Sequence, residues 1–345
     1  MGPSDTTAAL RAHLLAGQVI PAHPLALDER RRLDEPHQRA LTRYYLASGA
    51  GGVAVGVHTT QFAIREHWMY EPVLKLASEI VDSDLVRCPR PFVKVAGIVG
   101  QTRHAIREAR IALDAGYDTG LLSLAAWRGE SEDAVLEHCR AFAEAIPLFG
   151  FYLQPAVGGR VLSYEFWRAF SEIPQLVAIK IAPFDRYQTL EVTRAVADAG
   201  RSDVALYTGN DDHIIGDLLE RQPGSAIVGG LLGQWAMWTS KAVALVERLR
   251  GRAPSDAGLR ELLAEAPSLT DANGAIFDAA NGFAGCIPGI HEVLRRQGLV
   301  DGIWCLDPNE TLSPGQLEEI DRVLDAYPFL QDDDFVAQHL DEWLR

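Results

Sequence analysis

Short apolar runs alternate with helical segments along the first 250 residues, and this alternation constrains the fold more than any other feature. Eight runs are rich in apolar or β-branched residues, and a stretch with helical spacing follows each of them. The eight predicted strands cover residues 18–21, 52–57, 92–99, 119–124, 149–153, 176–181, 203–207 and 225–228. Strands separated by helices favour a parallel sheet, and eight such units predict an α/β fold of the (β/α)8 type, the TIM barrel.

Helices are predicted between the strands and again after the last of them. Those of the barrel cover residues 35–48, 66–81, 102–115, 131–145, 164–172, 187–199, 212–221 and 234–250. Five more follow without intervening strands, over 256–265, 271–282, 288–298, 314–326 and 333–344. We therefore expect a catalytic barrel over 1–250 and a C-terminal helical appendage packed on it over 251–345, linked by 251–256. The last helix could cover the barrel or form a subunit contact.

Composition narrows the class of protein. The 345 residues are 48% hydrophobic and 23% charged, which suits a globular chain with a sizeable core. Thirty-two basic residues against 47 acidic ones give a net charge of −15, which disfavours nucleic-acid or membrane-surface partners. No apolar run approaches the roughly 20 residues of a membrane helix, and the first residues do not resemble a signal sequence, so a cytoplasmic location is expected. The four cysteines are far apart and are expected to be small buried side chains rather than disulfides or metal ligands.

Lysine is scarce, with only Lys75, Lys94, Lys180 and Lys241 among the basic residues. Lys94 stands near the start of its predicted strand and should lie at the non-catalytic end of the barrel beside a surface acid. Lys180 stands near the end of its strand, which places its amine at the catalytic mouth. Burial there lowers a lysine pKa, and a neutral amine can condense with a ketone to form an imine. A structural lysine paired with a carboxylate explains the position equally well.

Two further segments could contribute polar groups at the mouth. Tyr152 ends the preceding strand, where a phenol could transfer protons, although an isolated tyrosine is more often a core residue bonded to backbone. The turn containing His58, Thr59 and Thr60 follows the second strand and could hold a carboxylate. An ordinary hydrogen-bonded loop explains the same residues.

Other patterns point away from nucleotide and metal chemistry. The glycine-rich segments 97–102 and 229–233 match no dinucleotide or P-loop fingerprint and are interpreted as close-packing turns, the later one a candidate wall of the substrate site. The ten histidines include no H-x-H and no H-E-x-x-H motif. Asp211, Asp212 and His213 could ligate a metal, but capping of the following helix explains the two acids more simply.

Taken in order, these motifs resemble the dihydrodipicolinate synthase and N-acetylneuraminate lyase family of Schiff-base barrels. The turn at 56–61 is similar to the family's G-T-T-G-E, Tyr152 with Pro155 to its Y-N-x-P, and Ile179-Lys180 to its I-K. The resemblance extends along most of the chain. It includes the segment 96–102 followed by 115–116, the segment 208–211, which is similar to the family's S-G-x-D, and the helical residues 293–299 and 312–314.

The resemblance implies roles for particular residues. Lys180 would form the imine, Tyr152 would transfer protons, and His58, Thr59 and Thr60, in a register uncertain by one residue, would bind the carboxylate of a 2-oxo acid beside Gly209. There are also departures. Leu153 replaces the family asparagine, and Val157 stands where the synthase has an arginine, with Arg160 displaced nearby. The tyrosine that the synthase lends across its subunit interface is absent around residues 124–127, where His58 could substitute as a titratable group.

These features predict a lyase or aldolase that forms a Schiff base with pyruvate or a related small 2-oxo acid and that differs in substrate from dihydrodipicolinate synthase. Sugar-acid dehydration through the same imine is an alternative, as is a non-catalytic barrel that binds an oxo acid. A metal-dependent barrel hydrolase comes third. The imine chemistry calls for no metal or organic cofactor, and the resemblance implies a homo-oligomer, a tetramer.

Overall fold

The computed structural model of the chain describes residues 3–220, 226–249 and 255–345. Eight parallel strands form one sheet in the order β1-β8-β7-β6-β5-β4-β3-β2. The two ends of the sheet meet because the Gly51 amide donates to the Val19 carbonyl at 3.0 Å and the His23 amide donates to the Ala54 carbonyl at 2.8 Å. The predicted (β/α)8 barrel is therefore confirmed.

The strands are β1 (Val19–Pro21), β2 (Gly52–Val55), β3 (Val93–Ile98), β4 (Thr119–Leu122), β5 (Leu148–Leu153), β6 (Leu176–Ala182), β7 (Ala205–Thr208) and β8 (Ile227–Leu232). All eight overlap a predicted strand. The prediction of 225–228 for the last one was wrong in extent: its first residue lies outside the described residues, and β8 runs on to Leu232. The segment 229–233 is thus mostly strand rather than a turn, because its glycines pair with β1 and β7.

The α-helices of the barrel are α1 (Pro3–Leu15), α2 (Glu35–Ala47), α3 (Tyr70–Arg87), α4 (Thr102–Asp114), α5 (Glu132–Ala143), α6 (Tyr164–Phe170), α7 (Arg186–Asp198), α8 (Ile214–Leu219) and α9 (Thr239–Leu249). After them come α10 (Asp256–Ile276), α11 (Cys286–Arg296), α12 (Gln316–Ala326) and α13 (Asp333–Trp343). Short 3-10 helices include η1 (His58–Thr60), η5 (Gln234–Ala236) and η6 (Ala279–Asn281).

Two helices differ from the expectation. Residues 256–265 and 271–282 were predicted as separate helices, but α10 is continuous through Pro267. Pro267 is exposed, while Leu262, Leu269 and Ile276 bury one face of the same helix, and this packing outweighs the local penalty of the proline. The predicted link over 251–256 falls largely outside the described residues.

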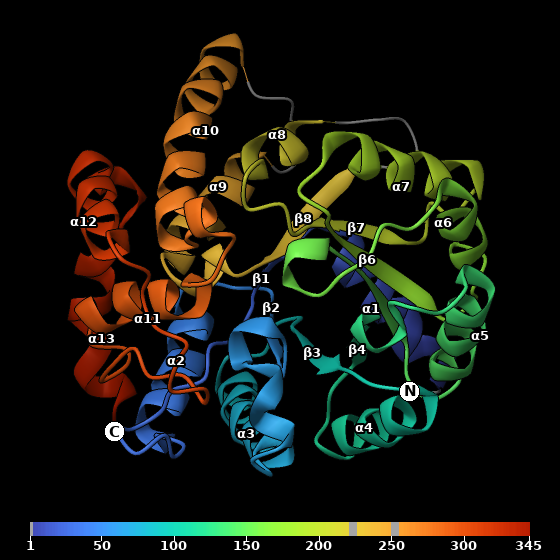
Figure 1. Cartoon of the computed structure of the whole chain (residues 1–345), viewed down its shortest axis with the longest axis horizontal. Helices are drawn as coiled ribbons and strands as arrows, with labels where there is room; N and C mark the ends of the chain where they lie inside the picture. Colours follow the sequence, from blue (N-terminus) through green and yellow to red (C-terminus); the bar gives the residue numbers. More distant parts are fainter. Residues whose placement is uncertain (1–2, 221–225, 250–254) are drawn as a thin grey trace.

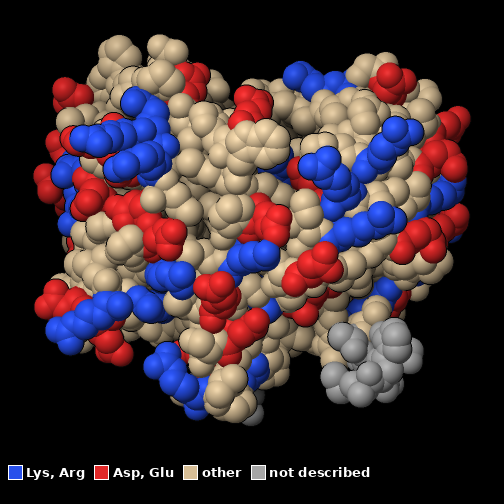
Figure 2. Space-filling model, turned by 90° about the horizontal axis from the view of Figure 1, so that it is seen from below, with Lys and Arg blue, Asp and Glu red and all other residues tan. Residues whose placement is uncertain are grey.

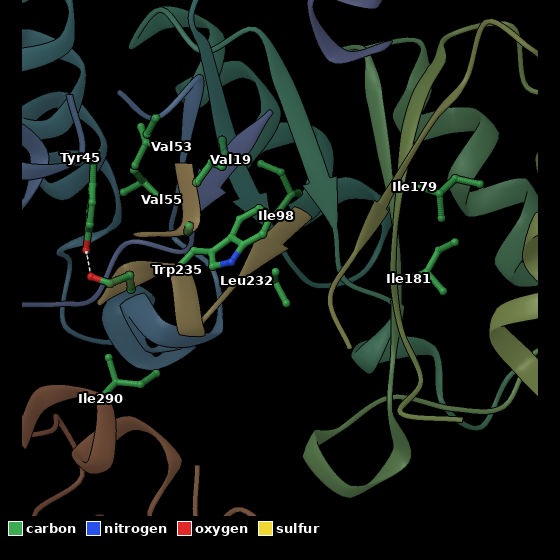
Figure 3. Packing of buried hydrophobic residues seen from close by; sticks show 14 of the residues in the cluster. Val19, Tyr45, Val53, Val55, Ile98, Ile179, Ile181, Leu232, Trp235 and Ile290 are labelled. Atoms are coloured by element: carbon green, nitrogen blue, oxygen red, sulfur yellow. Dashed lines mark hydrogen bonds between the residues drawn. The ribbon is translucent and has the colours of Figure 1, made fainter. Parts of the chain in front are cut away.

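Helix α1 was not predicted, and it closes the amino-terminal end of the barrel. Leu14 on α1 is fully buried in the cluster that fills the barrel interior, together with Ile20, Val95 and Phe149. The Tyr207 hydroxyl of β7 donates to the Leu14 carbonyl at 2.8 Å. A second and larger cluster lies between the sheet and the surrounding helices; in Figure 3, Ile179 and Ile181 project from the same side of β6 into this outer layer.

The C-terminal helices α10 to α13 pack against one side of the barrel, next to α2, α8 and α9 (Figure 1). Val336 and Trp343 of α13 belong to the same buried cluster as Tyr44 of α2. Ile276 and Ile290, from α10 and α11, are part of that cluster too. Within the described residues, the C-terminal helices and the barrel therefore share one continuous apolar core.

Charged side chains of both signs are interspersed on the face shown in Figure 2, without a single extended basic patch. Among the described residues, no helix is both long enough and apolar enough to cross a bilayer.

Candidate active site

Lys180 projects into the barrel near the carboxyl end of β6. Its neighbours Ile179 and Ile181 face the outer helices, and alternation along the strand therefore turns Lys180 inward. The strand pairing sets Phe151 of β5 directly beside it. The Lys180 Nζ lies 4.7 Å from the centre of the Phe151 ring. The predicted position of Lys180 at the barrel mouth is what the structure shows.

A cavity surrounds this amine at the carboxyl ends of the strands. Most of its wall is apolar, with residues from β5 and β6 below and from α11 and the end of α10 above. Its polar side chains are His58, Thr59, Gln154, Lys180, Asp211 and Cys286. Among the described residues that line it, Lys180 is the one lysine and arginine does not occur. The site is therefore an apolar chamber that contains an amine and a carboxyl group.

Burial sets the ionisation of Lys180. Desolvation lowers the pKa of the amine to about 8, while the nearby charge of Asp211 acts in the opposite direction. An appreciable fraction of the amine is consequently neutral near pH 7, as a nucleophile must be. Among the described residues, no carboxylate oxygen forms a direct ion pair with Lys180 Nζ, and Asp211 is the carboxyl group whose charge acts on it.

Asp211 enters the cavity from the loop after β7. The expectation that Asp211 or Asp212 caps α8 was wrong, because the N-cap residue is His213 and no side chain caps the helix. Instead the Asp211 carboxylate accepts a hydrogen bond from the Gln234 amide at 3.3 Å. Asn273 of α10 donates to the Asp211 carbonyl at 2.7 Å and fixes the loop. The sequence did contain a hint of this role, because Asp211 is the acid of the segment that resembles the family's S-G-x-D. Asp211 was instead interpreted from the sequence as a helix cap.

Burial raises the pKa of Asp211 to about 7, and the charge of Lys180 opposes this rise. A carboxyl group with a pKa near neutrality can both accept and donate a proton at the pH of most cells. Asp211 therefore combines a suitable position with a suitable acidity.

Tyr152 lies on the other side of the sheet. Because β5 pairs Phe151 with Lys180, the next residue faces the outer layer, where Tyr152 packs against Trp167 of α6 with ring centres 4.9 Å apart. Its hydroxyl donates to Gln188 Oε1 of α7 at 2.7 Å. The structure brings Lys180 and Tyr152 onto adjacent strands but does not bring the phenol into the cavity.

The turn after β2 contributes part of its predicted set. His58 and Thr59 line the cavity, whereas Thr60 is fully buried with its hydroxyl bonded to the His23 carbonyl at 2.6 Å. The Thr59 hydroxyl donates to the Ala22 carbonyl at 2.8 Å. Within the described residues, the backbone amides of His58 and Thr59 form no hydrogen bond. Burial, together with the charge of Lys180, lowers the pKa of His58 to about 4, so its imidazole is neutral.

Gly209 lines the cavity beside Lys180, as expected. A Cβ atom on Gly209 would lie 2.5 Å from Lys180 Cε and 2.8 Å from the Ala182 Cβ, closer than carbon atoms can approach. Only glycine leaves room for the lysine side chain to run past this point.

Several other predicted features lie away from the cavity. Lys94 binds Asp82 of α3 at 2.6 Å, as expected for the far end of the barrel. Arg160 donates to the carbonyls of Trp127 and Glu130 and does not reach the site. The one described cluster with metal-ligating spacing is Asp34, His37 and Asp301 rather than residues 211–213. The expectation that every cysteine is buried was wrong for Cys88, which is exposed.

A sequence model of the dihydrodipicolinate synthetase family matches residues 16–221, which is more than half of the chain. The chain belongs to the dihydrodipicolinate synthetase family. This family includes lyases, and the assignment confirms the family resemblance seen in the sequence.

Curated relatives carry two different activities in their names. The 4-hydroxy-tetrahydrodipicolinate synthase of Persephonella marina is 23% identical over 181 residues, which cover 52% of this chain and 58% of that protein. The synthase of Aromatoleum aromaticum is 30% identical over 229 residues, 64% of this chain and 73% of that protein. The N-acetylneuraminate lyase of Citrobacter koseri is 25% identical over 209 residues, 60% and 66% of the two chains. The chain thus spans little more than half the length of the first of these relatives.

Solved structures of the family share the fold along almost the whole chain. Dihydrodipicolinate synthase from Oceanobacillus iheyensis superposes with a TM-score of 0.72 at 19% identity, covering 94% of this chain and 99% of that one. YagE, a prophage protein of Escherichia coli K12 solved in complex with pyruvate, gives a TM-score of 0.75 at 17% identity, covering 90% and 98%. The C-terminal helices therefore belong to the shared architecture.

Proposed function

We propose that this protein is a Schiff-base-forming lyase or aldolase that acts on pyruvate or a related small 2-oxo acid through Lys180. The observation that carries this proposal is a lysine with a lowered pKa in a largely apolar cavity at the catalytic end of a barrel of this family, with no second lysine and no arginine among the described lining residues. Pyruvate complexes of two structural neighbours, YagE and the Acinetobacter baumannii synthase, support the substrate class.

The chemistry uses the lysine nitrogen as an electron sink. Neutral Lys180 Nζ adds to the ketone carbon, and the ketone oxygen, once protonated, leaves as water to give a protonated imine. Loss of a proton from the neighbouring carbon then forms an enamine, because the C=N bond accepts the electron pair. The enamine carbon can bond to an aldehyde carbon, and hydrolysis of the imine frees a 4-hydroxy-2-oxo acid and the lysine. Cleavage is the reverse sequence.

Asp211 is the group that we assign to proton transfer in these steps. As the carboxylate it takes the proton from the carbon next to the imine, and as the acid it returns that proton to the aldehyde oxygen. It shares the cavity with Lys180, whereas the Tyr152 hydroxyl is bonded to Gln188 behind the sheet. The role that the resemblance implies for Tyr152 has no support in this geometry.

The carboxylate of the oxo acid is assigned to the turn after β2. The amides of His58 and Thr59 supply donors there, and Gly209 leaves the space beside the lysine. Thr60 stabilises the turn from behind, since its hydroxyl accepts the Gly56 amide at 3.0 Å. Neutral backbone donors can hold a carboxylate without placing a second cation next to the amine that must lose its proton.

The substrate differs from that of dihydrodipicolinate synthase in this proposal. Val157 lines the cavity at the position where the synthase carries an arginine, and Arg160 is bonded to backbone carbonyls elsewhere. Dehydration of a sugar acid through the same imine and non-catalytic binding of an oxo acid remain the two alternatives. We also propose the tetramer implied by the resemblance and the cytoplasmic location expected from the sequence, which light scattering and fractionation would test.

Reductive trapping tests the central claim. The protein is incubated with pyruvate and then borohydride, and the adduct is located by peptide mass spectrometry. We expect an adduct on Lys180 that is absent in Lys180→Ala and retained in Lys75→Ala, a control in which half-exposed Lys75 lies on the surface of α3. If neither pyruvate nor a larger 2-oxo acid gives an adduct, the oxo-acid-binding alternative replaces the enzyme.

A further inference from the structure

Much of the cavity wall is built from apolar side chains of two separate parts of the chain. Leu153 and Val157 come from the end of β5 and the loop behind it, and Phe184 follows β6. Phe277, Phe283 and Ile290 come from the C-terminal helices and the loop between them. The appendage therefore does not only pack beside the barrel but supplies the outer wall of its site.

Two phenylalanines of the cavity wall contact each other. The rings of Phe184 and Phe283 contact each other edge to face, with centres 5.6 Å apart and planes inclined by 68°. Both residues have left-handed backbone conformations, with φ of 55° and 69°. This conformation is costly for a residue with a side chain and is retained where the surrounding structure requires it. Each of the two contacting rings of the cavity wall is thus carried by a residue with an unfavourable backbone conformation.

The two phenylalanine rings are not completely buried. Phe184 and Phe283 are partly exposed, as are Leu153 and Val157 of the same cavity. Water reaching these surfaces would be displaced by an apolar group, at roughly 25 cal/mol for each Å² removed from water. A ligand that extends from Lys180 towards the mouth would gain this contribution only if its outer end were apolar.

Polar partners for the outer end of a ligand are few. Among the described lining residues, apart from Lys180 and Asp211, the polar side chains are His58, Thr59, Gln154 and Cys286. Thr59 donates its proton to the Ala22 carbonyl, and His58 is neutral. Cys286 is a weak hydrogen-bonding group. A chain of hydroxyl groups would find few side-chain partners, chiefly the Gln154 amide and the neutral His58 imidazole, and a second carboxylate or a phosphate would find no arginine and no second lysine among the described lining residues.

We propose that the reaction partner of the imine is an aldehyde with an apolar, ring-bearing substituent, and that Phe184, Phe283 and Val157 select it. In the synthetic direction, the pyruvate enamine carbon bonds to the aldehyde carbon, the aldehyde oxygen gains a proton, and hydrolysis of the imine releases a 4-hydroxy-2-oxo acid with an aromatic ring on C4. Because it concerns the partner of the same imine, this inference rests on the function proposed above.

The test measures imine formation and partner choice separately. Borohydride trapping with pyruvate alone reports the imine, and the rate of aldol addition is then compared for benzaldehyde, glyceraldehyde and succinic semialdehyde as apolar, hydroxylated and anionic partners. We expect the pyruvate adduct and a kcat/KM for benzaldehyde about tenfold or more above the other two. An adduct with preference for glyceraldehyde or succinic semialdehyde overturns this inference and leaves the lyase proposal intact. Absence of the adduct overturns both.

Substitutions of the residues that line the cavity test whether these residues cause the preference for an apolar aldehyde. Phe283→Ser should reduce the preference for benzaldehyde over glyceraldehyde by roughly tenfold. Val157→Arg should raise the rate with succinic semialdehyde relative to benzaldehyde, because it places a cation at the mouth. Leu263→Ser is the matched control, since Leu263 lies 56% exposed on α10 and outside the cavity. An unchanged preference in both mouth variants, each still trapping pyruvate, would overturn the assignment of this wall.

Discussion

Lys180 and Tyr152 lie on adjacent strands only one register step apart, yet their side chains point to opposite sides of the sheet. The amine enters an apolar cavity that contains Asp211, and the phenol enters the layer between β5 and the helices, where it meets Gln188. Identity and position along the chain made both residues candidates. The two side chains point to opposite sides of the sheet, and this favours Asp211 over Tyr152 as the group that transfers protons for Lys180.

Replacing Asp211 and Tyr152 separately distinguishes the two assignments. Asp211→Asn keeps the side-chain shape but cannot take up a proton, and we expect it to slow exchange of the pyruvate methyl protons with deuterated water by roughly 10²-fold or more. The lysine imine should still be trapped by borohydride. Tyr152→Phe should change the exchange rate by less than about threefold and reduce stability by about 1 kcal/mol through the lost hydrogen bond. A large loss of exchange in Tyr152→Phe would return the role to the phenol.

The rate of imine formation should depend on pH through the pKa of Lys180. The pKa is lowered to about 8, so the neutral fraction rises about tenfold per unit up to that pH and then levels off. Because the charge of Asp211 raises the lysine pKa, Asp211→Asn should move the inflection to lower pH. Borohydride trapping rates between pH 6 and pH 10, in about half-unit steps, measure both effects. A rate that climbs steadily to pH 10 would contradict a desolvated lysine.

Gly209 should not tolerate a side chain. A methyl group there would meet Lys180 Cε and the Ala182 Cβ, and we expect Gly209→Ala to slow pyruvate trapping by about tenfold or more by displacing the amine. Gly129→Ala is the matched control, because nothing lies within 4 Å of its added carbon. Equal trapping rates in the two variants would show that the lysine side chain can move aside.

Among the elements, α1 and α10 show how packing overrides local sequence signals. Helix α1 fills the amino-terminal opening of the barrel with Leu14, although nothing in its short sequence distinguishes it from an ordinary leading segment. Helix α10 continues through Pro267 because its buried face bridges the barrel and α12. The same helix holds the Asp211 loop through Asn273, so the appendage reaches the candidate catalytic group as well as the cavity wall.

The role of α1 as the floor of the barrel can be measured by unfolding. Leu14 is fully buried, and Leu14→Ala should reduce the free energy of unfolding by about 2 to 5 kcal/mol in a urea titration. Leu15→Ala at the next position, where the side chain is 37% exposed, should cost less than about 1 kcal/mol. Similar losses at both positions would mean that α1 contributes helix propensity rather than packing.

At the scale of the whole molecule, one apolar cluster runs from the outer face of the barrel into the C-terminal helices. Trp343 of α13 packs on Tyr44 of α2 with ring centres 5.6 Å apart, and Ile290 of α11 lines the cavity itself. The expected division into a barrel and a C-terminal appendage therefore separates strand-containing from purely helical segments within one apolar core. We expect the two parts to unfold together.

Calorimetry tests that expectation. Trp343→Ala should lower the Tm of a single transition by roughly 5 °C, because the lost packing destabilises barrel and appendage alike. Phe329→Ala, at a side chain that is 48% exposed, should leave the Tm nearly unchanged. Two resolved transitions, of which only one responds to Trp343→Ala, would show that the appendage is an independent domain.

The amino-acid sequence was enough to predict the barrel, the family and the position of Lys180 on its strand. Regular alternation of apolar runs and helices needs no tertiary information, and the last residues of a parallel strand always reach the catalytic end. The departures at Leu153 and Val157 were also visible in the sequence, and they remain the basis for expecting a substrate other than that of the synthase.

Which side chains face the cavity could be read only from the folded structure. In a parallel barrel both faces of every strand are buried, so apolar residues follow one another without the polar alternation that would assign a face. Phe151 and Tyr152 are therefore equivalent in the sequence until the register of β5 with β6 turns one towards Lys180 and the other away from it. The same holds for Asp211, Phe277 and Phe283, which meet at one cavity because strand pairing and helix packing join segments far apart in the chain.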